Sequence, residues 1–553
     1  MSGEADTAVA RGERALAAGD WTAAVDAFGA ALERAETPEA LAGYGEALWW
    51  LGENHEGMAY RERGYVAFRH EGNPERAVDV ALWLCKNHLA TLGNPAAARG
   101  WLARARRLVD EHGLEEWHGW VRLMEAYDAD AAEGEALARE AHELARARAD
   151  ADMELCALAG VGGALVGQGR VTEGVGYLDE AMAGALAGEG RHRDTVVFTS
   201  CTTIIACTTC AEFERAVQWV RATDRFTRRY GCPFLYVQCR VLYAAVLFAT
   251  GDWDRAEEEL HTVLRASEGA LPALRAEGLA TLAELRLAQG RLEEAGRLVE
   301  GLEDQSAAVP VLAGLHLAHG RASTAEALLR RCVGEVGDSL EALGFLELLG
   351  EAARVGGRVD EAQDRGRALA ERGASLGCDL AVARGARLQG QALAEVSPEE
   401  ARRHLEEALA TFGRLGMPVE AARTRLRLAS LLRSHLPELA ADEARTALDV
   451  LEGVGASRDA AAASDLLREL GVAVARRGPR SLEILTHREQ EVFTLLGEGL
   501  SNPDIAERLY ISRRTAEQHV ARVLRKLGLR SRAEAAAEAT RQSHRAPPRF
   551  GAR

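Results

Sequence analysis

Basic side chains gather in one short stretch near the end of the chain. Residues 512–528, SRRTAEQHVARVLRKLG, hold four arginines and Lys526, which is one of only two lysines among 553 residues. Guanidinium and ammonium groups are the side chains that bind phosphate, and arginine can also donate two parallel hydrogen bonds to a guanine edge. The stretch therefore has the composition of a surface that binds a polyanion.

The charge of the chain is divided unevenly. The formal net charge is −17, yet residues 476–553 hold 16 Lys and Arg against 9 Asp and Glu, which leaves 51 against 75 in residues 1–475. An acidic body with a basic end indicates that the end, and not the body, meets a polyanion. On charge alone, a merely solvated basic face is the alternative.

The spacing of apolar residues predicts that the basic stretch is a helix with two faces. The residues that share its apolar side are Ala516, Val520, Val523, Leu524 and Leu527. The opposite side carries Arg513, Arg514, Glu517, Gln518, Ala521, Arg522 and Arg525. Ser512 is expected to cap this helix and Gly528 to end it.

Three further short helices are predicted around it. Thr486 to Glu489 is a capping box that opens a helix ended by Gly497. Asn502 is expected to cap a short helix before the basic one, and Ser531 to Glu534 is a second capping box that opens the last. A short helix, a brief turn and a polar-faced helix make a helix-turn-helix, whose second helix enters the DNA major groove.

Residues 485–539 resemble the DNA-binding domain of LuxR-type transcriptional regulators. The matching blocks are LTxRExEV, the G-x-S/N-x-x-IA turn, S-x-x-T-x-x-x-H and the RKLG-x-x-SRAEA end, and they cover about a tenth of the chain. The resemblance implies a four-helix domain that binds double-stranded DNA as a homodimer. One departure is Ala516, where the family usually has Val or Ile.

The resemblance also implies roles at the matching positions. The residues expected to face bases are Glu517, Gln518 and Ala521, with Arg522 beside them. Those expected to contact phosphates or the groove wall are Arg514, Thr515, His519, Arg525 and Lys526, and Arg513 lies on the same side. The expected core residues are Ile505, Ala506, Leu509, Val520 and Leu527. The last helix, around Ala533 to Ala537, would pair two domains. Two alternatives stay open: His519 is a core or capping residue, and Glu517 forms an ion pair with Arg513 or Arg514.

A recurring pattern fills the chain before this domain. A turn, mostly Gly followed by Asp, Asn or Arg, opens an Ala-rich and Leu-rich helix about every 30 to 42 residues. The turns begin at Gly19, Gly52, Gly93, Gly169, Ala211, Gly251, Gly290, Gly320, Gly357 and Ser397. Helix pairs that cannot bury their apolar faces alone stack into a superhelix. The pattern resembles the tetratricopeptide repeat in a degenerate form.

We therefore predict an all-α chain. Its parts are a tetratricopeptide-like α-solenoid over 1–475, a linker over 476–482, the LuxR-type helix-turn-helix domain over 483–541 and a disordered tail over 542–553. The Trp-rich N-terminal third either packs repeats together or lines a groove for a peptide or small molecule.

Several function classes lack the residues they need. The lysines, Lys86 and Lys526, follow no glycine-rich loop, so no Walker A nucleotide site is expected. No catalytic constellation is present, so no enzyme activity, cofactor or metal is predicted; a sensor built on Cys201, Cys207 and Cys210 is the weaker alternative. The uncharged run at 195–211 is short and polar for a membrane span, which predicts a buried helix and no membrane partner. Scattered cysteines indicate the cytoplasm.

The predicted function is a sequence-specific transcriptional regulator, by family resemblance an activator that contacts RNA polymerase and joins the nucleoid when bound to DNA. Its repeat body would bind an effector or partner protein and control DNA binding. The alternative is a helical-repeat scaffold with a non-specific DNA-binding tail.

Overall fold

The computed structural model describes residues 2–337, 339–340, 342–472, 487–508 and 513–527, together with 529, 531–532, 534–536 and 538–539. The chain divides into two compact units, Met1–Val472 and Ala473–Arg553. The described residues form helices and no strand, so the all-α prediction is confirmed.

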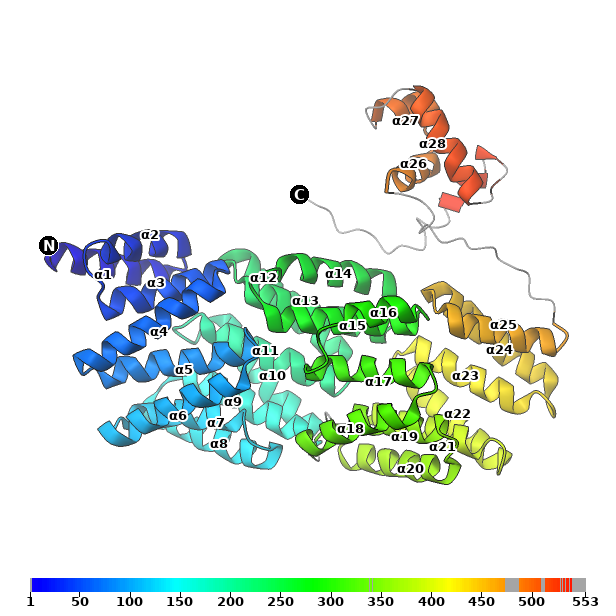
Figure 1. Cartoon of the computed structure of the whole chain (residues 1–553), viewed down its shortest axis with the longest axis horizontal. Coiled ribbons are helices and arrows are strands. Elements are labelled where there is room, and N and C mark those ends of the chain that lie inside the picture. The colour runs from blue at the N-terminus through cyan, green and yellow to red at the C-terminus, as the bar shows by residue number, and fades with distance from the viewer. Residues whose placement is uncertain are drawn as a thin grey trace. The chain divides into compact units, whose positions relative to one another are not determined.

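The first unit is a succession of helices in antiparallel pairs (Figure 1). Its first half contains α1 (Ser2–Ala18), α2 (Trp21–Leu32), α3 (Pro38–Leu51), α4 (Asn54–Glu71), α5 (Pro74–Ala90), α6 (Pro95–His112), α7 (His118–Ala126), α8 (Ala131–Arg148), α9 (Ala151–Gly167), α10 (Val171–Ala187), α11 (Asp194–Thr209) and α12 (Phe213–Tyr230), with a short 3-10 turn η1 (Glu115–Trp117). Its second half contains α13 (Pro233–Ala249), α14 (Trp253–Ala266), α15 (Pro272–Ala288), α16 (Leu292–Leu298), η2 (Ser306–Ala308), α17 (Val309–Ala318), α18 (Ala322–Val336), α19 (Ala342–Val355), α20 (Val359–Ser375), α21 (Asp379–Leu393), α22 (Pro398–Arg414), α23 (Pro418–Leu432), α24 (Pro437–Val454) and α25 (Ser457–Glu469).

Every predicted turn opens the second, even-numbered helix of a pair. At Gly19 the backbone has φ +77°, a left-handed conformation that glycine adopts without a Cβ clash, and the carboxylate of Asp20 accepts a hydrogen bond from the N–H of Ala23 at 3.1 Å. Ala211, which stands where most turns have glycine, takes the same left-handed conformation with φ +64°. The pattern missed α8 and α24, which begin after Asp130 and Leu436 without a preceding glycine turn.

Odd-numbered helices of successive pairs contact one another through most of this unit, for example α7 with α9, α9 with α11 and α11 with α13. Each pair also packs against the next, as α4 does against α5 and α10 against α11. Stacking of this kind gives each apolar face a partner that a single pair cannot supply. The predicted tetratricopeptide-like solenoid is confirmed.

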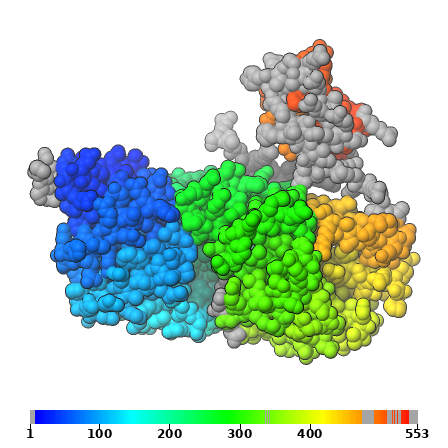
Figure 2. Space-filling model, in the orientation of Figure 1, coloured from blue at the N-terminus to red at the C-terminus, as the bar shows by residue number. Residues whose placement is uncertain are grey.

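The solenoid winds tightly enough for distant segments to touch. The indole N–H of Trp21 donates to the carbonyl of Tyr230, which is 209 residues away. The side-chain amide of Asn54 donates to the carbonyl of Ala270 at 3.2 Å across a separation of 216 residues. In Figure 2, the green surface of the middle repeats abuts the blue N-terminal repeats and the yellow C-terminal repeats. Successive superhelical turns therefore pack directly on one another.

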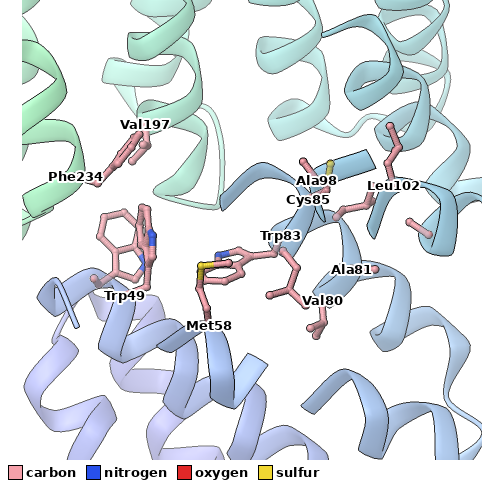
Figure 3. Close-up of a cluster of buried hydrophobic side chains, with 14 of the residues drawn as sticks. Trp49, Met58, Val80, Ala81, Trp83, Cys85, Ala98, Leu102, Val197 and Phe234 are labelled. Atoms are coloured by element: carbon pink, nitrogen blue, oxygen red, sulfur yellow. The ribbon is translucent and has the colours of Figure 1, made fainter. Parts of the chain in front are cut away.

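The tryptophans of the N-terminal third belong largely to the core between repeats. Trp49 is 3% exposed and lies 6.0 Å, between ring centroids, from Phe234 of α13. Figure 3 shows Phe234 and Val197 directed towards Trp49, with Met58 beside Trp83. Packing between repeats is therefore confirmed for Trp49, and packing also joins two superhelical turns.

The uncharged run of threonines forms α11, as a buried helix and not a membrane span. Thr199 is fully buried, and its hydroxyl donates to the carbonyl of Thr195 at 2.8 Å. Burial raises the pKa of the Cys207 thiol to about 12 and that of Cys210 to about 11, which opposes thiolate chemistry there. Among the described residues, no three ligating side chains are grouped as a metal site, and none of the helices could cross a membrane.

Candidate nucleic-acid interface

The second unit has an apolar core of its own. Its described helices are α26 (His487–Gly497), α27 (Asn502–Arg508) and α28 (Arg513–Lys526), and α28 contacts both of the others. The buried members of the core are Val492, Phe493, Leu495, Leu496, Ile505, Ala506, Ala516, Val520, Val523, Ala535 and Ala539. A separate core is what an independently folding domain requires. The predicted core positions Ile505, Ala506 and Val520 are confirmed; Leu509 lies outside the described residues.

The end of α26 has the geometry of a Schellman motif. The N–H of Gly499, where φ is +81°, donates to the carbonyl of Leu496 at 3.1 Å, and the N–H of Leu500 donates to that of Leu495 at 3.1 Å. A Cβ on Gly497 would lie 2.6 Å from the Cβ of Ala539, so glycine also lets the last segment approach. The helix ends at Gly497 as predicted.

The cap of α27 differs from the prediction. Ser501, not Asn502, precedes the helix: its hydroxyl accepts from the N–H of Asp504 at 3.4 Å. The Asp504 carboxylate in turn accepts from the Ser501 N–H at 2.9 Å and from its hydroxyl at 2.6 Å. These bonds hold the pKa of Asp504 below its usual value. The prediction of an Asn502 cap was wrong because a serine one residue earlier, with an acid three residues after it, forms the reciprocal capping box.

Arg532 joins three parts of this unit and was not singled out from the sequence. Its guanidinium donates to the side-chain oxygen of Asn502 at 2.7 Å and to the carbonyl of Leu500. Asn502 thus serves as an acceptor for arginine instead of a cap. The second predicted capping box is present, since the N–H of Glu534 donates to the Ser531 hydroxyl at 3.1 Å. The sequence signal that could have identified Arg532 was its position inside the capping box from Ser531 to Glu534.

The two faces of α28 follow the predicted pattern. Ala516, Val520 and Val523 are buried, and Leu524 and Leu527 pack against the same core. Ala516 is fully buried, so the smaller side chain at this position still contributes to the core. The apolar side of α28 is therefore anchored in the core, and on its other side Arg513 and Glu517 are exposed.

All ten predicted DNA-contacting residues lie on α28, and the structure describes the side chains of three of them. Arg513 and Glu517 are 72% and 48% exposed and form an ion pair with Nε and Oε1 3.1 Å apart. This is the ion-pair alternative for Glu517, and an exposed i,i+4 pair of this kind stabilises a helix by only about 0.3–0.5 kcal/mol. It can therefore rearrange at a binding surface at small cost.

His519 is half-buried, and its Nδ1 has no hydrogen-bond partner among the described residues. The other seven side chains lie outside the described residues, as do the predicted cap Ser512 and the predicted stop Gly528. They are Arg514, Thr515, Gln518, Ala521, Arg522, Arg525 and Lys526.

Two solved structures have a similar succession of helices. The APC/C hetero-tetramer Cut9–Hcn1 matches at 11% identity with a TM-score of 0.44, covering 84% of this chain and 96% of that one. Yeast Tom70 matches at 12% identity with a TM-score of 0.32 over the same shares.

The C-terminal unit matches a known family. Residues 483–539 match the family described as bacterial regulatory proteins, luxR family. The DNA-binding transcriptional activator DevR/DosR of Mycobacterium tuberculosis is 38% identical over 104 residues, which are 18% of this chain and 47% of the relative. The transcriptional regulatory protein LnrK of Bacillus subtilis is 48% identical over 58 residues, or 10% of this chain and 26% of LnrK.

The spore germination protein GerE of Bacillus subtilis is 39% identical over 62 residues, which are 11% of this chain but 84% of GerE. The matched segment thus spans about half the length of DevR/DosR and most of the length of GerE. In both comparisons it is less than a fifth of the present chain. Through this C-terminal domain, the chain belongs to the LuxR family of bacterial regulatory proteins.

Proposed function

We propose that this chain is a sequence-specific DNA-binding transcriptional regulator that binds DNA through the polar side of α28. The observation that carries the proposal is that the two sides of this helix differ in character. Its apolar stripe is fixed in the core of a LuxR-family domain, and its other side holds the concentrated basic residues. A helix held in this way can lie in the major groove and present side chains to base edges.

The proposed contacts divide into two kinds. Glu517, Gln518 and Ala521, with Arg522 beside them, would read base edges. The residues that would position the domain on phosphates or the groove wall are Arg513, Arg514, Thr515, His519, Arg525 and Lys526. On binding, Arg513 would exchange Glu517 for a phosphate, which frees the carboxylate to accept from a cytosine amino group. Phosphate contacts would make the affinity fall steeply with salt.

The repeat body would regulate this domain. Its net negative charge disfavours contact with DNA, which leaves its long inner surface for an effector or partner protein. Occupation of that surface would govern whether two DNA-binding domains pair as a homodimer on a two-fold site. Its similarity to DevR/DosR, a transcriptional activator, supports activation, and hence contact with RNA polymerase, in this chain too. The role is non-catalytic and cytoplasmic, at the nucleoid when DNA is bound.

Selection of genomic DNA fragments tests the proposal. The full chain and residues 482–545 alone would be incubated with fragmented DNA at physiological salt, and the bound fragments sequenced. Enrichment of one two-fold site by both proteins is the expected result. Enrichment by the isolated domain alone would make the body an inhibitory sensor. Enrichment by neither would replace this proposal with the helical-repeat scaffold that binds DNA without sequence preference.

A further inference from the structure

The first superhelical turn surrounds a cavity of about 910 Å³. Most of its lining comes from odd-numbered helices of the first repeats, namely α1, α3, α5, α7, α9 and the start of α11, and the even-numbered helices add Trp21 and Phe28 of α2, Arg61 of α4 and Arg148 of α8. Two contacts close it across the solenoid: Lys86 of α5 pairs with Asp194 of α11, and the guanidinium of Arg193 donates to the carbonyl of Ala17 at 2.6 Å. A volume of this size falls in the range of small-molecule sites.

Aromatic side chains form much of its wall. Trp50, Trp83, Trp120 and Phe198 line the cavity. Trp50 is held in place because its ring stacks on that of Trp21, with the centroids 4.3 Å apart. Figure 3 places Trp83 next to Met58. Such fixed rings favour a ligand with a planar, apolar body.

A buried cation in this wall lacks acceptors. The side chain of Arg61 is 4% exposed, and its guanidinium lies 4.5 Å from the ring centroid of Trp83. Its Nη1 is 3.5 Å from Oε2 of Glu46, and within the described part of the chain its Nε has no partner. A guanidinium has five N–H donors, and burying them with so few acceptors is unfavourable. An anionic group of a ligand would supply the missing acceptors.

Among the described residues, Glu46 pairs with no cation other than Arg61. The side chain of Glu46 is 34% exposed, and Glu46 is part of the cavity lining. Burial, helped by the nearby carboxylates of Asp79 and Asp194, raises the pKa of Glu46 although Arg61 opposes the shift. Four more acids on the lining have no ion-pair partner among the described residues, namely Glu13, Glu39, Glu75 and Glu116. The whole lining holds nine Asp and Glu against six Lys and Arg, so the cavity carries net negative charge and favours a ligand that also has a positive group.

We propose that this cavity is the effector site and that it binds a zwitterion with an α-amino-acid head group on a planar, apolar body. The carboxylate accepts from Arg61 and the ammonium group donates to Glu46, while the body lies against Trp50 and Trp83. The two opposite charges of the protein lie 3.5 Å apart, and an α-amino acid carries its two charges on one carbon, so the pairs match in spacing and sign. The inference rests on the proposed function only in treating the ligand as an effector.

Calorimetric titration of the full chain with three matched probes tests the inference: L-tryptophan, tryptamine, which lacks the carboxylate, and indole-3-propionate, which lacks the ammonium group. L-Tryptophan is expected to bind at least about tenfold more tightly than either analogue, as loss of a charged hydrogen-bonded partner implies. No binding of L-tryptophan, or equal affinity for all three probes, would overturn the inference.

Two variants assign the charges. Arg61→Met should remove the preference for L-tryptophan over tryptamine, and Glu46→Gln should remove the preference over indole-3-propionate. A matched control is Arg240→Met, because Arg240 also lies over an aromatic ring, Tyr236, and pairs with Glu259 but does not line the cavity. It should leave all three affinities unchanged. If Glu46→Gln weakened all probes alike, its role would be structural and the inference would fail.

The titration contains no DNA, so the two proposals fail separately. A protein that selects a DNA site but ignores the probes keeps the proposed function and loses this inference. A protein that discriminates the probes but shows no DNA preference does the reverse.

Discussion

Replacing Gly169 with alanine tests whether successive superhelical turns support each other. Gly169 lies in the turn between α9 and α10 with φ +84°, and a Cβ there would lie 2.2 Å from Cα of Leu376 and 2.5 Å from its carbonyl carbon. Leu376 follows α20, one superhelical turn further along the chain. Because the obstructing atoms belong to the backbone, no side chain can rotate out of the way.

The magnitude follows from a comparison with Gly320. That glycine occupies the equivalent turn before α18 with φ +73°, and a Cβ there would meet nothing within 4 Å. Both substitutions incur the cost of a left-handed alanine, about 1–2 kcal/mol. Gly169→Ala must also displace the turn at Leu376 by more than 1 Å, the difference between 2.2 Å and ordinary contact of 3.4 Å or more. Overpacking of this kind adds about 1–3 kcal/mol.

Hydrogen exchange followed by mass spectrometry measures the effect locally. Gly169→Ala should speed exchange both around residues 165–175 and around residues 374–382, whereas Gly320→Ala should speed it around its own turn only. The Gly169 variant should also unfold at a lower urea concentration than the Gly320 variant. Equal midpoints for the two variants, with unchanged exchange near Leu376, would refute direct packing between superhelical turns.

Three further perturbations have defined outcomes. Burial raises the pKa of Glu277 to about 7, so the folded chain keeps a proton that the unfolded chain loses, and stability should fall as pH rises from about 4.5 to 7. The Glu277→Gln variant should have the same thermal midpoint as wild type at pH 5 and a higher one at pH 8. Parallel pH profiles of the two midpoints would contradict this. Leu496 is fully buried, so Leu496→Ala should lower the unfolding free energy of the DNA-binding domain by about 2–5 kcal/mol in urea titrations. Glu498 is exposed, so the control Glu498→Ala should change that free energy by less than about 0.5 kcal/mol. Similar effects of the two substitutions would mean that α26 is not part of the core. Asp152 is 5% exposed, and its carboxylate accepts from two backbone N–H groups and from the Thr195 hydroxyl at 2.6 Å. Asp152→Ala should therefore lower the calorimetric midpoint by several degrees. An unchanged midpoint would show that the loop before α11 does not depend on this carboxylate.

Local chemistry made much of the architecture predictable. The turns at Gly19 and Gly169 are recognisable because a left-handed residue followed by a capping or polar residue is a short-range signal, and Ala211 follows the same rule without glycine. The two faces of α28 follow from helical spacing alone, and its apolar side packs as predicted. The start of α8 was missed because Asp130 caps it without a preceding glycine.

Relations between distant segments were not predictable in the same way. The hydrogen bond from Trp21 to Tyr230 depends on the pitch of the superhelix, which sums small rotations over several repeats. The pairing of Arg61 with Glu46 depends on how α3 and α4 rotate against each other, because α4 carries three arginines and the two helices together carry five acids. A sequence pattern identifies which residues are charged, and only the packed helices decide which of them face the cavity.

The ratio of two dissociation constants tests the central claim most directly: one for the two-fold site recovered by selection, the other for a scrambled duplex of equal length, both at physiological salt. A sequence-specific regulator should bind the selected site at least about 10³-fold more tightly. Arg514→Ala with Arg522→Ala should reduce that ratio, and Arg514→Ala alone should lower the slope of log affinity against log salt by about 1. Equal affinity for the two duplexes, or a double variant that binds the selected site as tightly as wild type, would contradict the assignment of α28 as the recognition helix.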